Sequence, residues 1–512
     1  MLSAGAPVAV VGAGAAGLVA IRVLREAGFR VVCFEASNEV GGTWVYADVN
    51  KVPDWAGHDV ALRNEPGGDD RRGSPSPSHS SPLHSSMYQS LRTNLPKQVM
   101  LFPGMPFPDA APSFPGHVEV QRYLLRYAER HAVRDHIRFE TPVQEVRPVS
   151  SRALDGYVVR YACRQRPDEV REEWYAAVCV CNGHYTVPYV PSHDSRSVHQ
   201  VDDESKEDAG RGIVEHLTDG TFAPGRIHHS HFYRQPTRYA QQRVLCLGAG
   251  PSGIDISLDV ARVAARPVYL SFHGSMPAAC VSALRRAGVQ PVAALTAVTG
   301  PRQVRLADGT QLDDLDVILL CTGYRYAFPF LADACEVRVQ HGGRVVTPLY
   351  RHLLPVHRPN LPLVGLPYSV VPFPLFEYQM RYVCRVLSGA IRLPSESAMR
   401  QDTREEWRAR TALGMAPRHF HRLGDRQWAY DRYLADAAGV KGPTLAAQSV
   451  YNDAGTSRKA NPVLYREREY RIFGDGPEDW EVAITVAETY GAERGDARER
   501  DDGNAADYSS VL

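Results

Sequence analysis

Short, mainly apolar runs, each ending near a glycine or a polar turn, recur along the chain. They lie at residues 8–11, 30–34, 178–181, 244–247, 268–272 and 317–321. Continuous runs of this length are typical of strands buried in a parallel sheet. A helical pattern occurs at 118–131, and the residues that share its apolar face are Val120, Tyr123, Leu124 and Tyr127. Strands that alternate with helices predict an α/β fold.

Two of these runs lead directly into the spacing G-x-G-x-x-G. The six glycines are Gly12, Gly14 and Gly17 in the first copy and Gly248, Gly250 and Gly253 in the second. This spacing lets the backbone turn tightly, approach a pyrophosphate and begin a helix whose positive N-terminus faces it. One copy is weak support, because glycine-rich turns recur by chance. Two copies, each between a strand and a helix, predict two Rossmann-like dinucleotide-binding domains and hydride transfer between their cofactors.

The strand after the first fingerprint ends in an acid. Glu35 follows residues 30–34 and lies 18 residues after Gly17. At that spacing a carboxylate accepts hydrogen bonds from ribose hydroxyls, although a solvated strand end would have the same sequence. We therefore expect FAD at the first site, with Glu35 on its ribose.

The corresponding strand after the second fingerprint, at 268–272, carries no acid. A missing acid removes repulsion of a 2′-phosphate, so NADPH is expected here. His273 follows that strand and can bind phosphate, but histidine is charged only part of the time at neutral pH. Arg234 and Arg266 are alternative phosphate ligands, and relaxed use of NADH is left open.

Composition narrows the function little further. At 512 residues the chain can bury a sizeable core and divide into two or more domains. It has 58 basic and 58 acidic residues, which gives no indication of a nucleic-acid or anionic-membrane partner. Its nine cysteines include no C-x-x-C pair, which favours a reducing compartment. With no signal peptide or membrane anchor recognised, the cytoplasm is the expected location, and a homodimer is left open.

Polar stretches interrupt the pattern and suggest domain boundaries. Residues 66–84 are rich in Ser, Pro and Gly and predict a mobile loop. The predicted architecture is an FAD domain in two pieces, with the NADPH domain inserted between them. The bounds are 1–191 and 316–480 for FAD, 192–215 for a polar linker, 216–315 for NADPH and 481–512 for a polar, disordered tail.

Several further segments match motifs of one family. They are residues 41–44, 86–97, 114–117, 181–185, 225–233, 321–324 and 373–379. With the fingerprints they resemble the flavin-containing monooxygenases from about residue 8 to 480, most closely the plant S-oxygenases and invertebrate pyrrolizidine-alkaloid N-oxygenases. One departure lies just before Gly225: the position of the signature phenylalanine holds Ala223, and Phe222 lies one residue earlier.

The resemblance implies a mechanism. NADPH reduces FAD, O2 adds to give a C4a-hydroperoxide, and a nitrogen or sulfur atom of a small amine or sulfide attacks its distal oxygen. Because the cofactor supplies the oxidant, the protein has to bind, orient and exclude water. Asn94 is the implied catalytic residue, whose amide can donate and accept beside the flavin. Taken alone, this asparagine would be interpreted as a turn residue.

The resemblance also implies the remaining cofactor contacts. They are Gly42, Trp44 and Thr93 near the flavin, His229 and Ser230 as linker groups near NADP, Ser252 at the second pyrophosphate, and Thr322 and Gly323 near the dinucleotides. A structural turn is the alternative for Thr322 and Gly323. A zinc site at His228, His229 and His231 is a competing interpretation, but no Cys or carboxylate at ligand spacing joins them, so no metal is predicted.

Three other classes share parts of the pattern. A Baeyer–Villiger monooxygenase is one alternative, although its signature normally ends in H-x-x-x-W-P, where this chain has Tyr233 and Arg234. A disulfide reductase requires a cysteine pair that the chain lacks. A non-enzymatic protein that binds FAD and NADP is the other alternative, because the altered signature turn could disable transfer.

Overall fold

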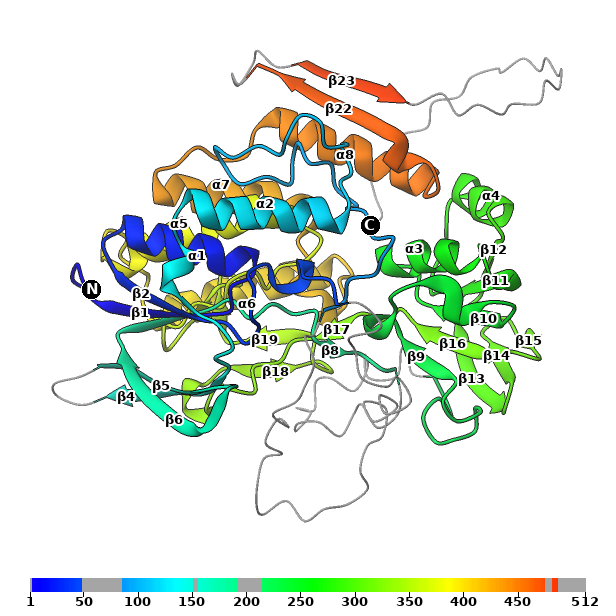
Figure 1. Ribbon diagram of the computed structural model, residues 1–512, viewed down its shortest axis with the longest axis horizontal. Helices are drawn as coiled ribbons and strands as arrows, with labels where there is room; N and C mark the ends of the chain where they lie inside the picture. Colours follow the sequence, from blue (N-terminus) through cyan, green and yellow to red (C-terminus); the bar gives the residue numbers. More distant parts are fainter. Residues whose placement is uncertain (1, 48–84, 151–154, 192–213, 475–480, 487–512) are drawn as a thin grey trace.

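A computed structural model describes residues 2–47, 85–150, 155–191, 214–474 and 481–486 (Figure 1). The predicted loop at 66–84 and most of the predicted linker at 192–215 lie outside the described residues. The described chain forms two lobes, each built around a parallel sheet (Figure 1).

The first fingerprint belongs to a four-stranded parallel sheet with the order β3-β2-β1-β7. The strands are β1 (Pro7–Val11), β2 (Arg30–Phe34), β3 (Ile137–Arg138) and β7 (Ala177–Val180). Alternate residues of β1 point to opposite faces. Val8 and Val10 pack on α1 (Ala15–Glu26) and α2 (His117–Arg130), while Ala9 and Val11 pack on an antiparallel sheet. Both faces of the sheet are therefore covered, which explains the unbroken apolar run.

The second fingerprint belongs to a five-stranded parallel sheet with the order β12-β11-β10-β16-β9. The strands are β9 (Ile227–His229), β10 (Arg243–Leu247), β11 (Ala265–Ser271), β12 (Val289–Val292) and β16 (Val317–Leu320), and the helices are α3 (Pro251–Val260) and α4 (Ala278–Arg286). The predicted division assigns residues 317–320 to the FAD piece, but β16 pairs in parallel with β10. A buried apolar run does not reveal which of two parallel sheets it joins.

The remaining strands form small antiparallel sheets. β4 (Val143–Ser150), β5 (Asp155–Cys163) and β6 (Arg166–Tyr175) pair in that order. β13 (Leu295–Gly300), β14 (Gln303–Leu306) and β15 (Gln311–Leu312) form another sheet. The pairs of strands are β8 (Val187–Pro188) with β17 (Tyr324–Arg325), β18 (Arg338–Gln340) with β19 (Val345–Thr347), and β20 (Leu349–Tyr350) with β21 (Leu354–Pro355).

The chain returns to the first lobe after β16. The helices of this part are α5 (Pro372–Leu387), α6 (Glu396–Ala412), α7 (Gln427–Ala438) and α8 (Leu445–Ala460). α5 packs against α1 in the same apolar core, so the second lobe is inserted within the first. The 3-10 helices are η1 (Gly42–Trp44), η4 (Arg134–His136), η7 (Ser230–Phe232), η8 (Pro236–Tyr239), η9 (Asp333–Cys335), η10 (Pro417–His419), η11 (Gly424–Arg426) and η12 (Tyr465–Glu467).

The start of the predicted disordered tail is a strand. β23 (Glu481–Val486) pairs antiparallel with β22 (Arg468–Phe473), and the two lie along α8 (Figure 1). Its β-branched residues favour an extended backbone, a preference that the polar composition of the surrounding tail obscures. Residues 487–512 lie outside the described part of the chain.

Candidate functional site

The first fingerprint forms a tight turn at the carboxyl end of β1. Gly12 has a φ of +99°, and a Cβ there would lie 2.7 Å from the carbonyl oxygen of Cys181. A Cβ on Gly17 would lie 1.8 Å from the carbonyl oxygen of Gly12. Real side chains do not tolerate either approach, so only glycine permits this crossing of β1, α1 and the end of β7. The turn leads directly into the N-terminus of α1, which is where a pyrophosphate binds in this motif.

The turn at 41–44 closes over this fingerprint. The main-chain N–H of Gly41 donates to the carbonyl of Ala13 at 3.0 Å. The position of a Cβ on Gly14 lies 3.5 Å from Cα of Gly42. Trp44 is half-buried against the core of the first lobe. The predicted flavin residues Gly14, Gly42 and Trp44 are therefore brought together.

Glu35 lies beside the same turn and is 8% exposed. One carboxylate oxygen accepts from the N–H of Ala13 at 2.6 Å, and the other accepts from the N–H and hydroxyl of Ser37 at 2.8 and 2.7 Å. A carboxylate offers about four acceptor positions, so room remains for a ribose hydroxyl. Glu35 also holds the fingerprint turn, a role that spacing alone did not indicate.

The second fingerprint repeats this geometry at the carboxyl end of β10. Gly248 has a φ of +108°, and a Cβ there would lie 2.6 Å from the carbonyl oxygen of Cys321. A Cβ on Gly253 would lie 1.8 Å from the carbonyl oxygen of Gly248. Around a Cβ on Gly250 no described atom lies within 4 Å, and Ser252 is exposed in the first turn of α3. The second turn is thus open where a pyrophosphate would approach.

The three candidate ligands of the 2′-phosphate lie in different places. His273 is exposed just beyond β11, at the same carboxyl edge as the second fingerprint. Arg266 lies at the opposite end of β11, where its Nε donates to the carbonyl of Ala261 at 2.9 Å. Arg234 is 4% exposed and donates to the carbonyls of Ala47, Ser85, His231 and Tyr233. Neither arginine is therefore placed to bind the phosphate, and the positions of both alternatives could not be read from the sequence.

His229 is buried where β9 leads into η7. Its Nδ1 accepts from the N–H of His231 at 3.0 Å, so the neutral ring carries its proton on Nε2. Burial lowers the pKa of His229 to about 4; main-chain groups of Gly323 and Tyr189 oppose this shift only in part. Nε2 makes no hydrogen bond of normal geometry to any described residue. A buried donor that is only poorly satisfied by main-chain groups fits an acceptor group of a dinucleotide.

The loop after β16 lies close to both His229 and the second fingerprint. The ring of His229 is 5.6 Å from that of Tyr324. The N–H of Thr322 lies 3.7 Å from the Cβ position of Gly248, and the Thr322 hydroxyl donates to the carbonyl of Tyr189. Gly323 accepts from the N–H of Tyr189 at 2.9 Å. Thr322 and Gly323 thus form a structural turn that also borders the second site, while Ser230 is buried at the start of η7.

Thr93 and Asn94 follow two residues, Tyr88 and Ser90, that hydrogen-bond to α3 of the second lobe. Thr93 is buried, and its hydroxyl donates to the carbonyl of Leu95 at 2.8 Å. Asn94 is half-buried, and no described residue hydrogen-bonds to its side-chain amide. Its donor and acceptor are therefore available for a ligand.

The displaced signature phenylalanine is packed in the interior. Phe222 is buried in the core of the second lobe, and the N–H of Ala223 donates to the carbonyl of Pro301 at 2.9 Å. Within the described residues, no group of three or more His, Cys, Asp or Glu side chains could hold a metal ion.

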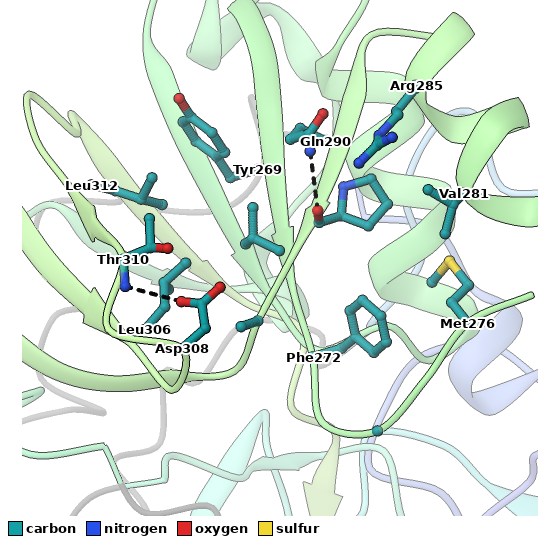
Figure 2. Close-up of a pocket in the computed structure, with 14 residues that line it drawn as sticks. Tyr269, Phe272, Met276, Val281, Arg285, Gln290, Leu306, Asp308, Thr310 and Leu312 are labelled. Carbon is teal, nitrogen blue, oxygen red and sulfur yellow. Dashed lines mark hydrogen bonds between the residues drawn. The ribbon is translucent and has the colours of Figure 1, made fainter. Parts of the chain in front are cut away.

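A cavity of about 560 Å³ is lined by residues of β11, α4, β12 and the ends of β14 and β15, and Figure 2 shows these side chains. It contains Phe272 and Gly274, the neighbours of His273, but no glycine of either fingerprint. Two of its polar side chains bond locally: Asp308 accepts from the N–H of Thr310 at 3.0 Å, and Gln290 donates to the carbonyl of Pro291 at 3.3 Å. We do not assign this cavity to a cofactor.

Comparison with known proteins decides the family. A profile described as "Flavin-binding monooxygenase-like" matches residues 77–205 and 291–447, and one described as "NAD(P)-binding Rossmann-like domain" matches 10–71. The Arabidopsis thaliana protein "Flavin-containing monooxygenase FMO GS-OX-like 4" is 34% identical over 472 residues, which cover 90% of this chain and 93% of that protein. The chain belongs to the flavin-containing monooxygenase family.

Solved structures agree with this family. The S-allyl-L-cysteine S-oxygenase of Allium sativum superimposes with a TM-score of 0.72 at 32% identity, covering 90% of this chain and 95% of that one. Tmm from Pelagibacter has a TM-score of 0.69 at 23% identity, covering 94% and 97%, and shows the fold alone. The predicted family and α/β fold class are confirmed, and the matches support FAD and NADPH as cofactors.

The family makes this flavin-containing monooxygenase an oxygenase that acts on a small molecule with O2. Among the described residues, no helix is both long and apolar enough to cross a membrane.

Proposed function

We propose that this flavin-containing monooxygenase uses NADPH and O2 to form a C4a-hydroperoxyflavin and oxygenates a nitrogen or sulfur atom of a small amine or sulfide. The observation that carries the proposal is a pair of glycine turns of the same geometry in one chain. The Allium sativum protein, at 32% identity, is an S-oxygenase, which favours sulfur as one of the acceptors. A cytoplasmic location and a homodimer stay predictions.

The overall reaction balances without any nucleophile from the protein. The substrate atom donates its lone pair to one oxygen of O2 and forms the new N–O or S–O bond. The other oxygen leaves as water, reduced by the hydride of NADPH together with one proton. FAD supplies the redox chemistry when bound, which leaves binding, orientation and water exclusion to the side chains.

The residues of the first lobe fit the binding of FAD. The turn at 12–17 and the N-terminus of α1 would hold the pyrophosphate, Glu35 would hold the ribose, and Gly42, Trp44 and Thr93 would border the flavin. We assign the second turn, at 248–253, to NADPH.

Four further side chains complete the proposed site. Ser252 would contact the second pyrophosphate and His273 the 2′-phosphate. His229 would donate from its neutral ring. Asn94 would hold oxygen and nicotinamide, because its amide donates and accepts without a charge.

The first test is direct. Purified protein should be yellow, with about one FAD per chain, and should consume O2 when NADPH is added. Mass spectrometry of products from a thioether, a tertiary amine and a cyclic ketone then identifies the oxygenated atom. A sulfoxide or N-oxide supports the proposal. A lactone as the main product would indicate the Baeyer–Villiger alternative, and bound flavin without O2 consumption would contradict both.

Asn94→Ser tests the catalytic assignment. A shorter hydroxyl cannot span the same donor–acceptor pair, so water reaches the reactive centre. Flavin reduction by NADPH should stay near normal, while product per NADPH falls roughly ten- to a hundred-fold, the equivalent of about 1–3 kcal/mol. Asn461→Ser is the matched control, since the side-chain oxygen of Asn461 accepts from the N–H groups of Val463 and Leu464, and a serine hydroxyl can accept there as well. If Asn94→Ser stays fully coupled, Asn94 is a turn residue.

A further inference from the structure

Arg466 lies where three parts of the chain meet. It belongs to η12, and its side chain is 14% exposed. Its guanidinium binds both carboxylate oxygens of Asp255 in α3, at 2.9 and 2.6 Å. Its Nε donates to the carbonyl of Thr93 at 2.9 Å. Asp255 comes two residues after Gly253, and Thr93 directly precedes Asn94. One side chain therefore spans the second fingerprint helix and the segment of Asn94.

The contact is reciprocal. Arg92 donates from Nη2 to the carbonyl of Arg466 and from Nη1 to the carboxylate of Glu467, both at 2.9 Å. Each arginine thus binds the main chain of the other's segment. Because neither segment can slide without breaking both sets of charge-assisted hydrogen bonds, the pair fixes their relative position.

Two hydroxyl groups also attach the segment 88–94 to α3. Tyr88 donates to Asp255 at 3.2 Å, and Ser90 donates to Asp259 at 2.7 Å. Asp255 and Asp259 are one turn apart, an arrangement of like charges that destabilises a helix. The charge of Arg466 offsets it. Asp255 thus forms a contact between segments 211 residues apart.

We propose that Arg466 is a positioning residue for oxygenation: bound to Asp255, it holds Asn94 in place relative to the helix that begins at the second fingerprint. The proposal rests on the function proposed above. A guanidinium suits this role because its planar fork binds a carboxylate with two nitrogens while the third donates elsewhere. Lysine keeps the positive charge but cannot reproduce that arrangement.

The test uses full-length, FAD-loaded enzyme with Arg466→Met, Arg466→Lys and Asp255→Asn. Hydrogen exchange of the amides at 88–94, measured without NADP, reports the attachment independently of turnover. It should be about tenfold or more faster in Arg466→Met. Product per NADPH should fall by a similar factor, with FAD content unchanged. Arg466→Lys should recover part of both effects. Combining Arg466→Met with Asp255→Asn should add little, because both remove one interaction.

Arg468→Met is the matched control. Arg468 is two residues away and pairs with Asp453 at 3.1 Å, outside the segments of both fingerprints. It should leave exchange at 88–94 and coupling unchanged. Unchanged exchange in Arg466→Met overturns the proposal, whatever the enzyme oxygenates. The proposal is also overturned if exchange is faster in Arg466→Met but its product per NADPH equals that of the unmodified enzyme. An unmodified enzyme that forms no oxygenated product contradicts the proposed function instead, and the exchange result still decides whether Arg466 fixes the segment.

Discussion

The two glycine turns share one backbone geometry and differ in their surroundings. In both, the first glycine lies under a carbonyl from a neighbouring strand end, Cys181 or Cys321, and the third lies against the carbonyl of the first. The middle glycines differ. Gly14 faces Gly42 of a closing turn, whereas Gly250 faces open space among the described residues.

The difference separates what the fold requires from what the ligand requires. The outer glycines are needed for a strand, a helix and a neighbouring loop to cross, so they say little about which cofactor is bound. The enclosed first turn, with Glu35 beside it, suits a cofactor that stays bound. The open second turn, with His273 beyond β11, suits one that enters and leaves in each cycle.

The largest expected effect comes from Gly14→Val. The space next to Gly14 is already limited by Gly42, and a branched side chain would occupy the position expected for the pyrophosphate. Purified variant should therefore lack FAD, as measured by its visible absorbance per chain, while its circular dichroism stays that of a folded chain. A folded Gly14→Val protein with full FAD would remove the basis for placing FAD at the first turn.

Gly250→Val makes the same change at the second turn. Because a Cβ there meets no described atom within 4 Å, the variant should fold and keep its FAD. Reduction of the flavin by NADPH, followed anaerobically in a stopped-flow instrument, should be abolished. A variant that loses FAD and still binds NADPH would show that the two sites are reversed.

The local part of each turn could be predicted from the sequence, and the contacts between them could not. Glycine spacing and apolar runs are properties of neighbouring residues, so both fingerprints and the helix at 118–131 were recognised. Arg466 and Asp255 are far apart in sequence, and nothing near either one indicates the other. Arg234 likewise looks in the sequence like an arginine that could bind a phosphate. In the structure it is buried, and its guanidinium donates to four main-chain carbonyls.

A smaller, pH-dependent effect is expected from the buried His229, in contrast to the exposed His273. The pKa of His229 is lowered by burial to about 4, against an ordinary 6.5. Between these values the unfolded chain binds a proton that the folded chain does not. The contribution of His229 to the free energy of unfolding is therefore fully present above pH 6.5 and is lost as the pH drops towards 4, by at most roughly 3 kcal/mol.

The free energy of unfolding, measured by urea denaturation from pH 7 to pH 4, should depend less on pH in His229→Gln than in the unmodified protein. His273→Gln, at an exposed histidine, is the control and should follow the unmodified protein. Equal slopes in all three proteins would show that His229 titrates normally.

The smallest expected effect concerns the choice between NADPH and NADH. His273 stands exposed at the carboxyl end of β11, where a permanent, two-pronged cation would meet a 2′-phosphate. His273→Arg should lower KM for NADPH relative to NADH by about tenfold, which corresponds to about 1.4 kcal/mol. Arg266→Gln changes charge on the same strand but at its other end, so it should leave the ratio unchanged. If His273→Arg also leaves it unchanged, the phosphate binds away from β11. The absence of an acid after the second fingerprint would then mean that this site accepts both NADPH and NADH rather than selecting NADPH.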